Sequence, residues 1–480
     1  MGLLKKPLRR KYELFRKEFI MKRVVKFLLL VFVFGMFLNL DVSYATVNED
    51  ELSTYLAKEV KKKTKKIDVS EYEISIDEVM ECWVSMLYEN PEIYNVSSYI
   101  SYSYNSSKNV TSITPTYISG RSASAFKREA GRMMSVIDDK MTDLEKALAL
   151  HDYIASVCEY DKNAAKNSYK SPVFTAYGAL VNKVCVCEGY TKAFMYGLKK
   201  CGIEAKYVSG GGHAWCTVKI DGEWYHVDCT WDDPLGNEIG DVKHTYFLKS
   251  DAYMRKKTGG NSHTWDSDKY VMCNSKKYDN TNIWDSVRTQ MIYKDGYWYF
   301  VKGTNNSYYY KYKMSTNKLT KIKKMPSKWF VNGNKGAYYT ECLKIATDGK
   351  YIYYNVPNGI RRMNFGGKSD RQILKLNTSM GKVYGINFAG SKLNYQIKKS
   401  PTGDLLTIIK SKKAGKTRAV YILSSIGTKS YVVSNRKVAT VASNGVITPK
   451  KKGTVTLTIR TKAKTTYPAT EGKVKVNIIS

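Results

Sequence analysis

The chain of 480 residues contains no apolar run long enough to cross a membrane as a helix. Its most apolar stretch, residues 27–40, is shorter than the roughly 20 residues that a membrane-spanning helix requires. Lys22, Arg23 and Lys26 precede this stretch, and Ser43-Tyr-Ala45 follows it. A basic segment, a short apolar segment and a small-x-small site are typical of a secretory signal peptide. We expect residues 1–45 to form such a signal, with Met21 as an alternative start and an uncleaved anchor as the competing interpretation.

The sequence also lacks a disulfide framework. The number of cysteines, nine, is odd, and their spacing suggests no pairing. Cys82, Cys158, Cys201 and Cys229 lie in apolar stretches, where a free cysteine packs as a small hydrophobic side chain. We expect these four cysteines in the core, although an exported context would permit disulfides.

Metal-binding spacings are absent as well. Cys185, Cys187, His213 and Cys216 lie close together in the sequence, but they do not form the two ligand pairs of a zinc site. The acidic residues between positions 232 and 241 lack the spacing of an EF-hand loop, so we expect a solvated acidic turn there. We therefore expect no cofactor, and a Cys/His metal site is the less favoured alternative.

Acidic residues are scarce in the second half of the chain. Residues 271–480 contain 40 Lys and Arg against 8 Asp and Glu, whereas residues 46–270 contain 28 against 32. This asymmetry predicts that the C-terminal half meets a polyanion. For an exported chain, that partner would be an anionic cell-wall polymer or lipid headgroups rather than nucleic acid. The alternative is a basic, solvated surface with no partner.

The length of the chain indicates about three domains. Residues 46–119 are expected to form an N-terminal helix and β extension, with helices within 46–66 and 76–87 and a hairpin over 97–117. Residues 120–270 are expected to form an α+β domain. Its expected helices cover 123–138, 142 to about 161, and 187–201, and its expected strands cover 203–208, 213–220 and 223–228.

Residues 271–414 are rich in aromatic strands and turns. Asp295-Gly and Asp348-Gly each precede a run of aromatic residues, 53 positions apart, and a weaker third copy begins at Ala389-Gly390. Such spacing is that of propeller blades, but two or three copies cannot close a propeller. We expect a partial, propeller-like β domain, with simple recurrence of hairpin turns as the alternative.

Residues 415–480 contain short strand patterns separated by turn signals. The stretch from Val438 to Ile459, with turns at Ser443-Asn-Gly and Lys452-Gly, resembles the bacterial Ig-like domain of group 2. This resemblance implies a small β-sandwich of the kind found on exported surface proteins.

A nucleophile, a base and an orienting carboxylate occur within 42 residues: Cys187, His213 and Asp228. Apolar residues recur with helical spacing from Cys187 to Cys201, and Gly202 follows as a stop, so Cys187 lies at a helix N-terminus. This position lowers the pKa of a thiol and supplies N–H groups for a developing oxyanion. Asp221-Gly222 predicts a two-residue hairpin whose register brings Asp228 within diagonal reach of His213. His213 can then act as the base and Asp228 can fix its tautomer.

These residues stand in the motifs Cys187-Glu-Gly-Tyr, His213-Ala-Trp and Trp224-Tyr-His-Val-Asp-Cys-Thr-Trp-Asp-Asp-Pro. The combination resembles the transglutaminase-like superfamily, especially its bacterial exported branch. The segments 148–154, 176–180 and 246–251 also resemble that family. The resemblance implies a papain-like fold, a triad of Cys187, His213 and Asp228, and activity as a cysteine peptidase, amidase or protein crosslinker.

Two cysteines raise questions about this site. Cys216 stands where relatives usually have Asn, which predicts reduced turnover if that Asn orients the base. Cys185 lacks the Gly-Tyr context of a nucleophile, so we expect it to be packed. For other residues, Tyr160 and Trp215 are candidates for substrate binding and the second oxyanion donor. His226 and His151 are expected to be structural.

We therefore expect a secreted or surface-associated protein of a Gram-positive type of bacterium. Its activity would be cysteine-dependent acyl transfer on a protein or peptide, such as a cell-wall peptide, and its basic β domains, residues 271–480, would hold it at the surface. The alternative is a catalytically idle binding or structural protein on the same scaffold. The sequence does not distinguish hydrolysis from transamidation.

Overall fold

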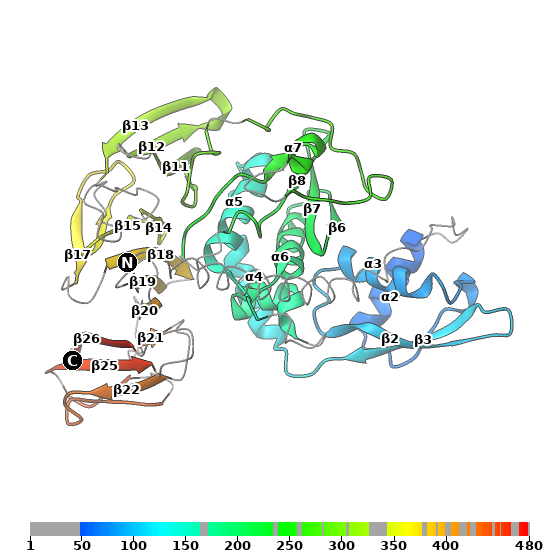
Figure 1. Cartoon of the computed structure of the whole chain (residues 1–480), viewed down its shortest axis with the longest axis horizontal. Coiled ribbons are helices and arrows are strands. Elements are labelled where there is room, and N and C mark those ends of the chain that lie inside the picture. Colours follow the sequence, from blue (N-terminus) through cyan, green and yellow to red (C-terminus); the bar gives the residue numbers. More distant parts are fainter. Residues whose placement is uncertain are drawn as a thin grey trace, which may run out of the picture.

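A computed structural model describes the part of the chain that follows residue 48, with gaps (Figure 1). The described residues are 49–163, 171–233, 239–256, 262–280, 283–303, 307–325, 343–376, 382–389, 392–398, 405–411, 420–422, 429–443, 447–451, 453–461 and 470–478. The expected signal peptide lies outside them. Within them, no helix is both long enough and apolar enough to cross a membrane.

The N-terminal segment forms a small α+β unit with its own hydrophobic cluster. The buried Trp83 lies at the centre of this cluster, and its indole N–H donates to Ser97 O at 3.1 Å. The expected hairpin is confirmed, because β2 and β3 pair antiparallel. The elements are α2 (Glu49–Lys61), β1 (Ile67–Asp68), η1 (Ser70–Tyr72), α3 (Val79–Glu89), β2 (Val96–Tyr104) and β3 (Val110–Tyr117).

The next part combines a helical layer with a four-stranded antiparallel sheet of order β6-β7-β8-β9. A capping box between Thr142 and Glu145 begins α5, and Gly202, with φ of +73°, follows the end of α6. The elements are α4 (Ala123–Met134), α5 (Asp143–Val157), β4 (Glu159–Tyr160), η3 (Pro172–Phe174), η4 (Gly178–Asn182), β5 (Val184–Cys185), α6 (Cys187–Lys200), β6 (Ala205–Gly210), β7 (His213–Ile220), β8 (Glu223–Val227), β9 (Phe247–Lys249) and α7 (Asp251–Arg255).

The expected helix from 142 ends earlier than the sequence indicates. Cys158 already has extended backbone, and Glu159 and Tyr160 form β4, which pairs in parallel with β5. The Cys158 thiol donates to Ala179 O at 3.3 Å, so this residue is fixed by contacts outside the helix. This tertiary pairing replaces the last helical turn.

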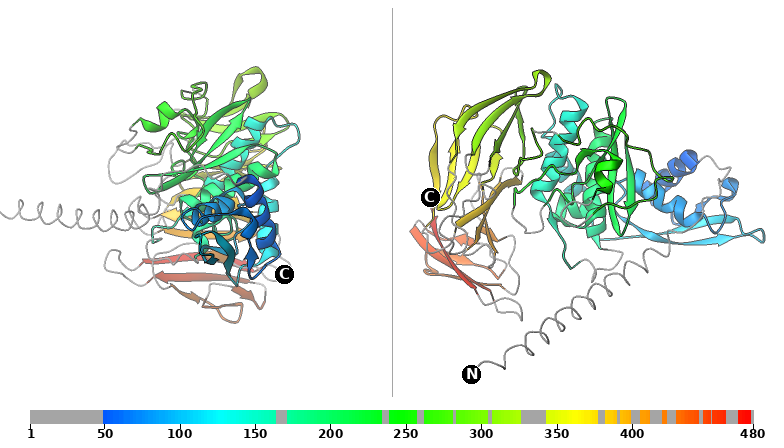
Figure 2. Two further views of the ribbon diagram at one scale, coloured as in Figure 1. Left: turned by 90° about the vertical axis from the view of Figure 1, so that its right-hand side faces the viewer. Right: turned by 45° about the horizontal axis from the view of Figure 1, so that its top comes forward.

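Three four-stranded antiparallel sheets follow, each with its strands in sequence order. Figure 2 shows them fanned out on one side of the helical layer. Asp295-Gly296 and Asp348-Gly349 form the first hairpin turn of the first two sheets, and Gly390 lies outside the described residues. The strands are β10 (Ile292–Lys294), β11 (Tyr297–Lys302), β12 (Tyr308–Lys313), β13 (Lys318–Lys324), β14 (Ile345–Thr347), β15 (Ile352–Val356), β16 (Gly359–Met363), β17 (Arg371–Lys375), β18 (Lys382–Ala389), β19 (Lys392–Lys398), β20 (Leu405–Ser411) and β21 (Val420–Ile422), with the short helix η5 (Met314–Thr316) between β12 and β13.

The last part holds a three-stranded sheet, β22-β25-β26, and a two-stranded sheet, β23-β24. Val433, Ala439, Ile447 and Leu457 share a small buried cluster that joins strands of both sheets. Whether this part is an Ig-like sandwich stays a prediction. The strands are β22 (Lys429–Val433), β23 (Ala439–Val441), β24 (Ile447–Pro449), β25 (Gly453–Thr461) and β26 (Thr470–Ile478).

Candidate active site

Cys187 begins α6, and the residues after it explain why the chain can place a thiol there. A Cβ atom on Gly189 would lie 2.6 Å from the carbonyl oxygen of Val173 and 2.6 Å from Cys185 Cβ. Only glycine fits so close to β5, which is the physical reason for the glycine two residues after Cys187. The preceding residue, Val186, is extended and provides no side-chain cap. The first N–H groups of α6 therefore remain as donors beside the thiol.

Two side chains of α6 connect Cys187 to the other parts of the site. The buried Thr191 hydroxyl lies 2.9 Å from Cys187 O and 3.1 Å from Ala214 O, so it joins the nucleophile's helix turn to β7. The Tyr190 hydroxyl donates to Asp233 in the segment after β8. The Cys-x-Gly-Tyr motif and the Asp-Asp-Pro motif therefore contact each other in the fold.

The hairpin of β7 and β8 brings His213 and Asp228 together. Ile220 pairs with Glu223 and Cys216 pairs with Val227, which is the register expected from the Asp221-Gly222 turn. Both turn residues have positive φ, 53° and 83°, as a type I′ turn requires. His213 Nε2 lies 2.7 Å from Asp228 Oδ2, so the expected contact is confirmed.

The electrostatics of this pair favour a charged imidazole. Burial lowers the pKa of His213, but the charge of Asp228 and hydrogen bonds to Asp228 and Cys187 outweigh it and raise the pKa to about 10. Burial raises the pKa of Asp228, but the charge and hydrogen bond of His213, with a second hydrogen bond from His263, hold it well below its usual range. Because Nε2 of His213 is bound to Asp228, Nδ1 is the nitrogen left for the thiol.

Sequence reasoning missed His263. Its Nε2 lies 2.8 Å from Asp228 Oδ2, the oxygen that His213 also contacts. The ring is buried, and its centroid lies 4.0 Å from that of Trp231. His263 follows Asp228 by 35 positions and belongs to no helix or strand, so no periodic pattern points to it.

The remaining histidines also contact aspartates. The buried His151 lies 2.8 Å from Asp152 and 3.2 Å from Asp232, which confirms it as a hydrogen-bonded core residue. His244, also missed, lies 2.9 Å from Asp152. His226 Nε2 lies 2.8 Å from Asp251, in agreement with a structural role.

Three groups of side chains bring three ligand atoms within 4.8 Å of one another in the described part of the chain. They are His151, Asp152 and His244; His213, Asp228 and His263; and His226, Asp251 and Cys273. In the first two groups two histidines contact one aspartate, and in the third the His226 ring and the backbone N–H of Cys273 both contact Asp251, so hydrogen bonds account for their closeness. Of the four residues considered for the less favoured Cys/His metal site, Cys185 and Cys216 are packed in the core.

The two substrate-binding candidates differ in their surroundings. Burial and the nearby Cys187 thiol raise the pKa of Tyr160 to about 12, so this half-buried side chain lies near the nucleophile. Trp215 is fully buried and its indole N–H donates to His226 Nδ1 at 2.9 Å. The expectation for Trp215 is corrected on this point, because its N–H already has a partner.

The cysteines near the nucleophile have unreactive surroundings. Burial raises the pKa of both Cys185 and Cys216 well above the usual thiol value. Cys216 lies in the largest hydrophobic cluster, on the strand face opposite to that of His213. Cys158 and Cys229 are buried and Cys82 and Cys201 half-buried, as expected for the core, and the eight described cysteines are all free.

The acidic segment after β8 is not a solvated turn. Asp232 is buried and accepts backbone N–H groups of Thr245 and Tyr246. Asp241 is buried and pairs with Lys344 at 2.6 Å. The expectation is therefore wrong for these two aspartates, while Asn237 and Glu238 lie outside the described residues.

The N-terminal segment also reaches the site. Tyr88 of α3 stacks on Tyr207 of β6 with ring centroids 3.7 Å apart. Burial raises the pKa of Tyr88, and the charges of Glu188 and Cys187 act in the same direction. A side chain from before residue 120 therefore lies beside the nucleophile's helix turn.

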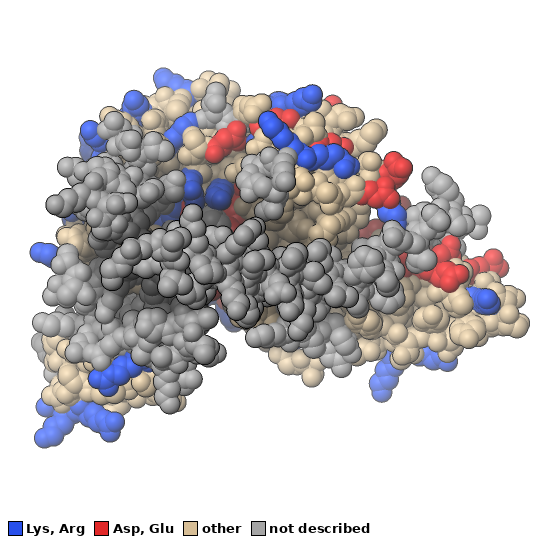
Figure 3. Space-filling view, in the orientation of Figure 1, with Lys and Arg blue, Asp and Glu red and all other residues tan. Residues whose placement is uncertain are grey.

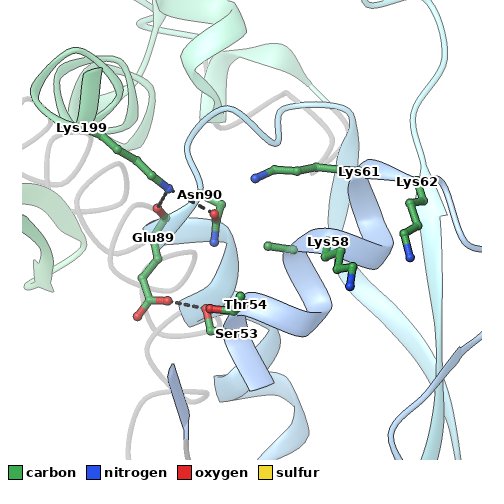
Figure 4. Close-up of a pocket in the computed structure, with 9 residues that line it drawn as sticks. Ser53, Thr54, Lys58, Lys61, Lys62, Glu89, Asn90 and Lys199 are labelled. Carbon is green, nitrogen blue, oxygen red and sulfur yellow. Dashed lines mark hydrogen bonds between the residues drawn. The ribbon is translucent and has the colours of Figure 1, made fainter. Parts of the chain in front are cut away.

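A pocket of about 610 Å³ lies at the other end of α6 (Figure 4). Lys199 Nζ donates there to Glu89 O at 3.0 Å and to Asn90 Oδ1 at 3.2 Å, which ties α6 to the end of α3. Lys199 is twelve residues from Cys187, so about 18 Å of helix separates the pocket from the thiol. This pocket lies at the interface between the N-terminal segment and α6, away from the triad.

Comparison with known proteins adds a family for part of the chain. The family model of the transglutaminase-like superfamily matches residues 132–229. A search of curated proteins found no match. The crystal structure of a TGase is 15% identical with a TM-score of 0.21, over 30% of this chain and 47% of that chain, so the match spans about half of its length.

Two other solved structures are similar at a lower level. Prolyl oligopeptidase B from Galerina marginata is 9% identical with a TM-score of 0.18, over 77% of this chain and 64% of that chain. The S-layer protein rSbsC is 11% identical with a TM-score of 0.12, over 91% and 59%. The family match includes the positions of Cys187, His213 and Asp228. Residues 132–229 form a transglutaminase-like superfamily domain.

Proposed function

We propose that this chain is a cysteine-dependent acyl-transfer enzyme that opens an amide bond through a thioester on Cys187. The observation that carries the proposal is the placement of Cys187 at the start of α6 with His213 beside it and held by Asp228 at 2.7 Å. A helix N-terminus favours the thiolate, and a raised imidazole pKa favours imidazolium, so both charges of the reactive pair are stabilised.

The reaction follows from this pair. The thiolate of Cys187 adds to the amide carbonyl carbon, and the charge that develops on oxygen faces the first N–H groups of α6. The C–N bond then breaks as His213 gives its proton to the departing nitrogen, which leaves as an amine. Water or a second amine loses a proton to His213 and adds to the thioester, and the thiolate departs. Asp228 keeps Nε2 protonated throughout and stabilises the imidazolium.

The acyl donor in this proposal is a protein or peptide, such as a cell-wall peptide. Hydrolysis and transamidation share every step up to the thioester, so the same three residues serve both. The proposal includes export, since residues 22–45 have the pattern of a secretory signal.

A specific observation favours a second role, attachment to a polyanion at the cell surface. Residues 271–480 hold 40 Lys and Arg against 8 Asp and Glu. Figure 3 shows the described Asp and Glu mainly over the helical and N-terminal parts, whereas Lys and Arg are spread over all parts of this face, including the β sheets. An anchored enzyme satisfies both roles, whereas an idle scaffold would satisfy only the second.

The first test is alkylation of the chain 46–480 by an iodoacetamide probe across pH, with mass spectrometry to locate the label. We expect selective labelling of Cys187 well below the ordinary thiol pKa of about 8.5 and loss of that selectivity in His213→Ala. Cys273→Ala serves as a control that removes a buried thiol outside the triad. Labelling of Cys187 no faster than an ordinary exposed cysteine would overturn the proposed enzyme and leave the idle scaffold.

A further inference from the structure

Two histidines contact a single carboxylate oxygen in this site. Asp228 Oδ2 lies 2.7 Å from His213 Nε2 and 2.8 Å from His263 Nε2. Asp228 is buried, so no bulk water competes for this oxygen. Each ring must donate an N–H to it, and the two donors share one accepting atom.

Close backbone packing places His263 beside Asp228. The segment that carries it passes so close to the glycines before His213 that a Cβ on Gly210 would lie 1.9 Å from Thr264 O. A Cβ on Gly211 would lie 2.5 Å from Thr264 Oγ1, and Gly211 has φ of +59°. Glycines at both positions therefore let residue 264 and its neighbour His263 approach the start of β7.

The contact with Asp228 is the polar contact that explains this placement. Among the described residues, His263 Nδ1 is buried without a hydrogen-bond partner. Nε2 is therefore the nitrogen through which the ring acts on its surroundings. The ring otherwise packs against Trp231 and lies near Trp215 at 4.8 Å between centroids.

Asp228 does not need His263 to keep its orientation. Its other oxygen, Oδ1, accepts the backbone N–H groups of Thr230 at 2.9 Å and Trp231 at 3.2 Å. Its own N–H donates to Tyr246 O at 3.0 Å. Since these contacts fix the carboxylate, the remaining effect of His263 is on the charge of Oδ2. A donor on a carboxylate oxygen weakens that oxygen as an acceptor for any other donor.

We propose that His263 is a positioning residue that competes with His213 for Asp228 Oδ2 and thereby limits the basicity of His213. This inference rests on the proposed function, in which His213 must both hold and release a proton. An imidazolium bound too firmly to its carboxylate would release its proton slowly to the leaving amine, and efficient transfer requires a pKa near the working pH. By this competition, His263 lowers the pKa of His213 toward the working pH.

Other titratable groups face the pair, and all of them except Cys187 stay unchanged in the test. They are Cys187 on α6, Tyr160 on β4, Cys216 on β7, His226 on β8, Cys229 after β8 and Tyr246 before β9. Among these groups, Cys187 is a direct hydrogen-bond partner of His213. A Cys187→Ala background removes this interaction, so the titration of His213 reports on its contact with Asp228.

The experiment is nuclear magnetic resonance titration of the histidine rings in the 46–480 chain carrying Cys187→Ala. The chain has only five histidines, so each ring signal can be assigned by single substitution. His263→Phe keeps a packed ring and removes the donor, whereas His263→Gln keeps an N–H donor at the end of the side chain. We expect the pKa of His213 to rise by roughly half a unit or more in His263→Phe and to stay near the starting value in His263→Gln.

Two results would overturn the proposal. Equal His213 titration in all three proteins would overturn the proposal and leave His263 as a packing residue. A fall of the His213 pKa in His263→Phe would also overturn it, because it would mean that His263 supports the base. His263→Leu, a second donor-free variant, is titrated alongside so that poor folding of one variant does not decide the result. The titration needs only the Asp228 contacts, whereas alkylation reports on Cys187, so the proposed function can fail while this inference stands.

Discussion

Gly189 is a position beside the nucleophile where the packing leaves no room for a Cβ atom. We expect Gly189→Ala to lower the midpoint of thermal unfolding and the rate of Cys187 alkylation, since its Cβ would meet Val173 O at 2.6 Å and force the first turn of α6 to shift. Gly131→Ala is the matched control, because a Cβ at that α4 position has no neighbour within 4 Å. The control should be neutral or stabilised by up to about 1 kcal/mol. An unchanged alkylation rate in Gly189→Ala would contradict the packing argument.

The parts of the site with a local signal could be predicted from the sequence. Helical spacing after Cys187 and the stop at Gly202 predict α6, and the Asp221-Gly222 turn fixes the register that joins His213 to Asp228. His263 could not be found in this way, because its position depends on a long-range contact with Asp228 and on two glycines near Thr264. A contact between an irregular segment and a distant strand end leaves no periodicity in the sequence.

At the scale of elements, the Thr191 hydroxyl forms a hydrogen-bonded link between α6 and β7 near the thiol. We expect Thr191→Val, which keeps the shape and removes the hydroxyl, to slow alkylation of Cys187 several-fold. Both Cys187 O and Ala214 O would lose their shared donor, at a cost of about 1 kcal/mol in unfolding free energy. Thr191→Ser restores the hydroxyl and should restore the rate. Equal rates of Cys187 alkylation in the valine and serine variants would show that the Thr191 hydroxyl does not position the thiol.

A buried network around α5 predicts how stability depends on pH. Burial lowers the pKa of His151, but hydrogen bonds to Asp152 and Asp232 outweigh it and raise the pKa to about 9. The protonated ring then contributes stability in full below the unfolded pKa of about 6.5, and this contribution is lost as pH rises through about 9. We expect the unfolding free energy to decrease over this interval, and His151→Gln to flatten the decrease by roughly 2–3 kcal/mol.

Urea unfolding at a series of pH values measures this slope. His226→Gln is the contrasting variant, since burial lowers the pKa of His226 despite its hydrogen bond to Asp251. Its contribution therefore changes on the acid side and should leave the alkaline slope unaffected. A steeper decrease in His151→Gln than in the unaltered chain would contradict the assignment of charge to His151.

At the scale of the molecule, the largest hydrophobic cluster does not stop at the boundary expected near residue 270. Trp284, Trp298 and Phe300 are buried in the same cluster as Phe194 of α6. Trp298 also donates its indole N–H to Glu145 of α5 at 2.9 Å. The first β sheet therefore packs directly on the helices that carry the site. The sequence indicates a change to aromatic-rich strand patterns at residue 271. It cannot show that the segments before and after this residue share one core, because burial across segments is a property of the folded chain.

This packing joins a sheet with exposed lysines to the helices that carry the site. Lys318, Lys321 and Lys324 are exposed on β13, the edge strand of the first sheet. Lysines on an edge strand also prevent sheet-to-sheet association, so their presence alone does not establish a partner. We expect replacement of all three by Gln to weaken binding of the 46–480 chain to purified cell wall several-fold at low salt, and to reduce the salt dependence of that binding.

The matched control carries the same change of charge in the nearly neutral part of the chain. Lys63, Lys65 and Lys66 are exposed in the N-terminal segment, and their replacement by Gln should leave binding unchanged. Cosedimentation at about 20, 150 and 500 mM salt, over which the Debye length shortens roughly fivefold, compares the two triple variants with the unaltered chain. Equal weakening by both variants would mean that net charge alone attracts the polymer. Unchanged binding in the β13 variant would place the contact elsewhere on the basic half, because exposed charges beyond a screening length of about 8 Å act independently at physiological salt.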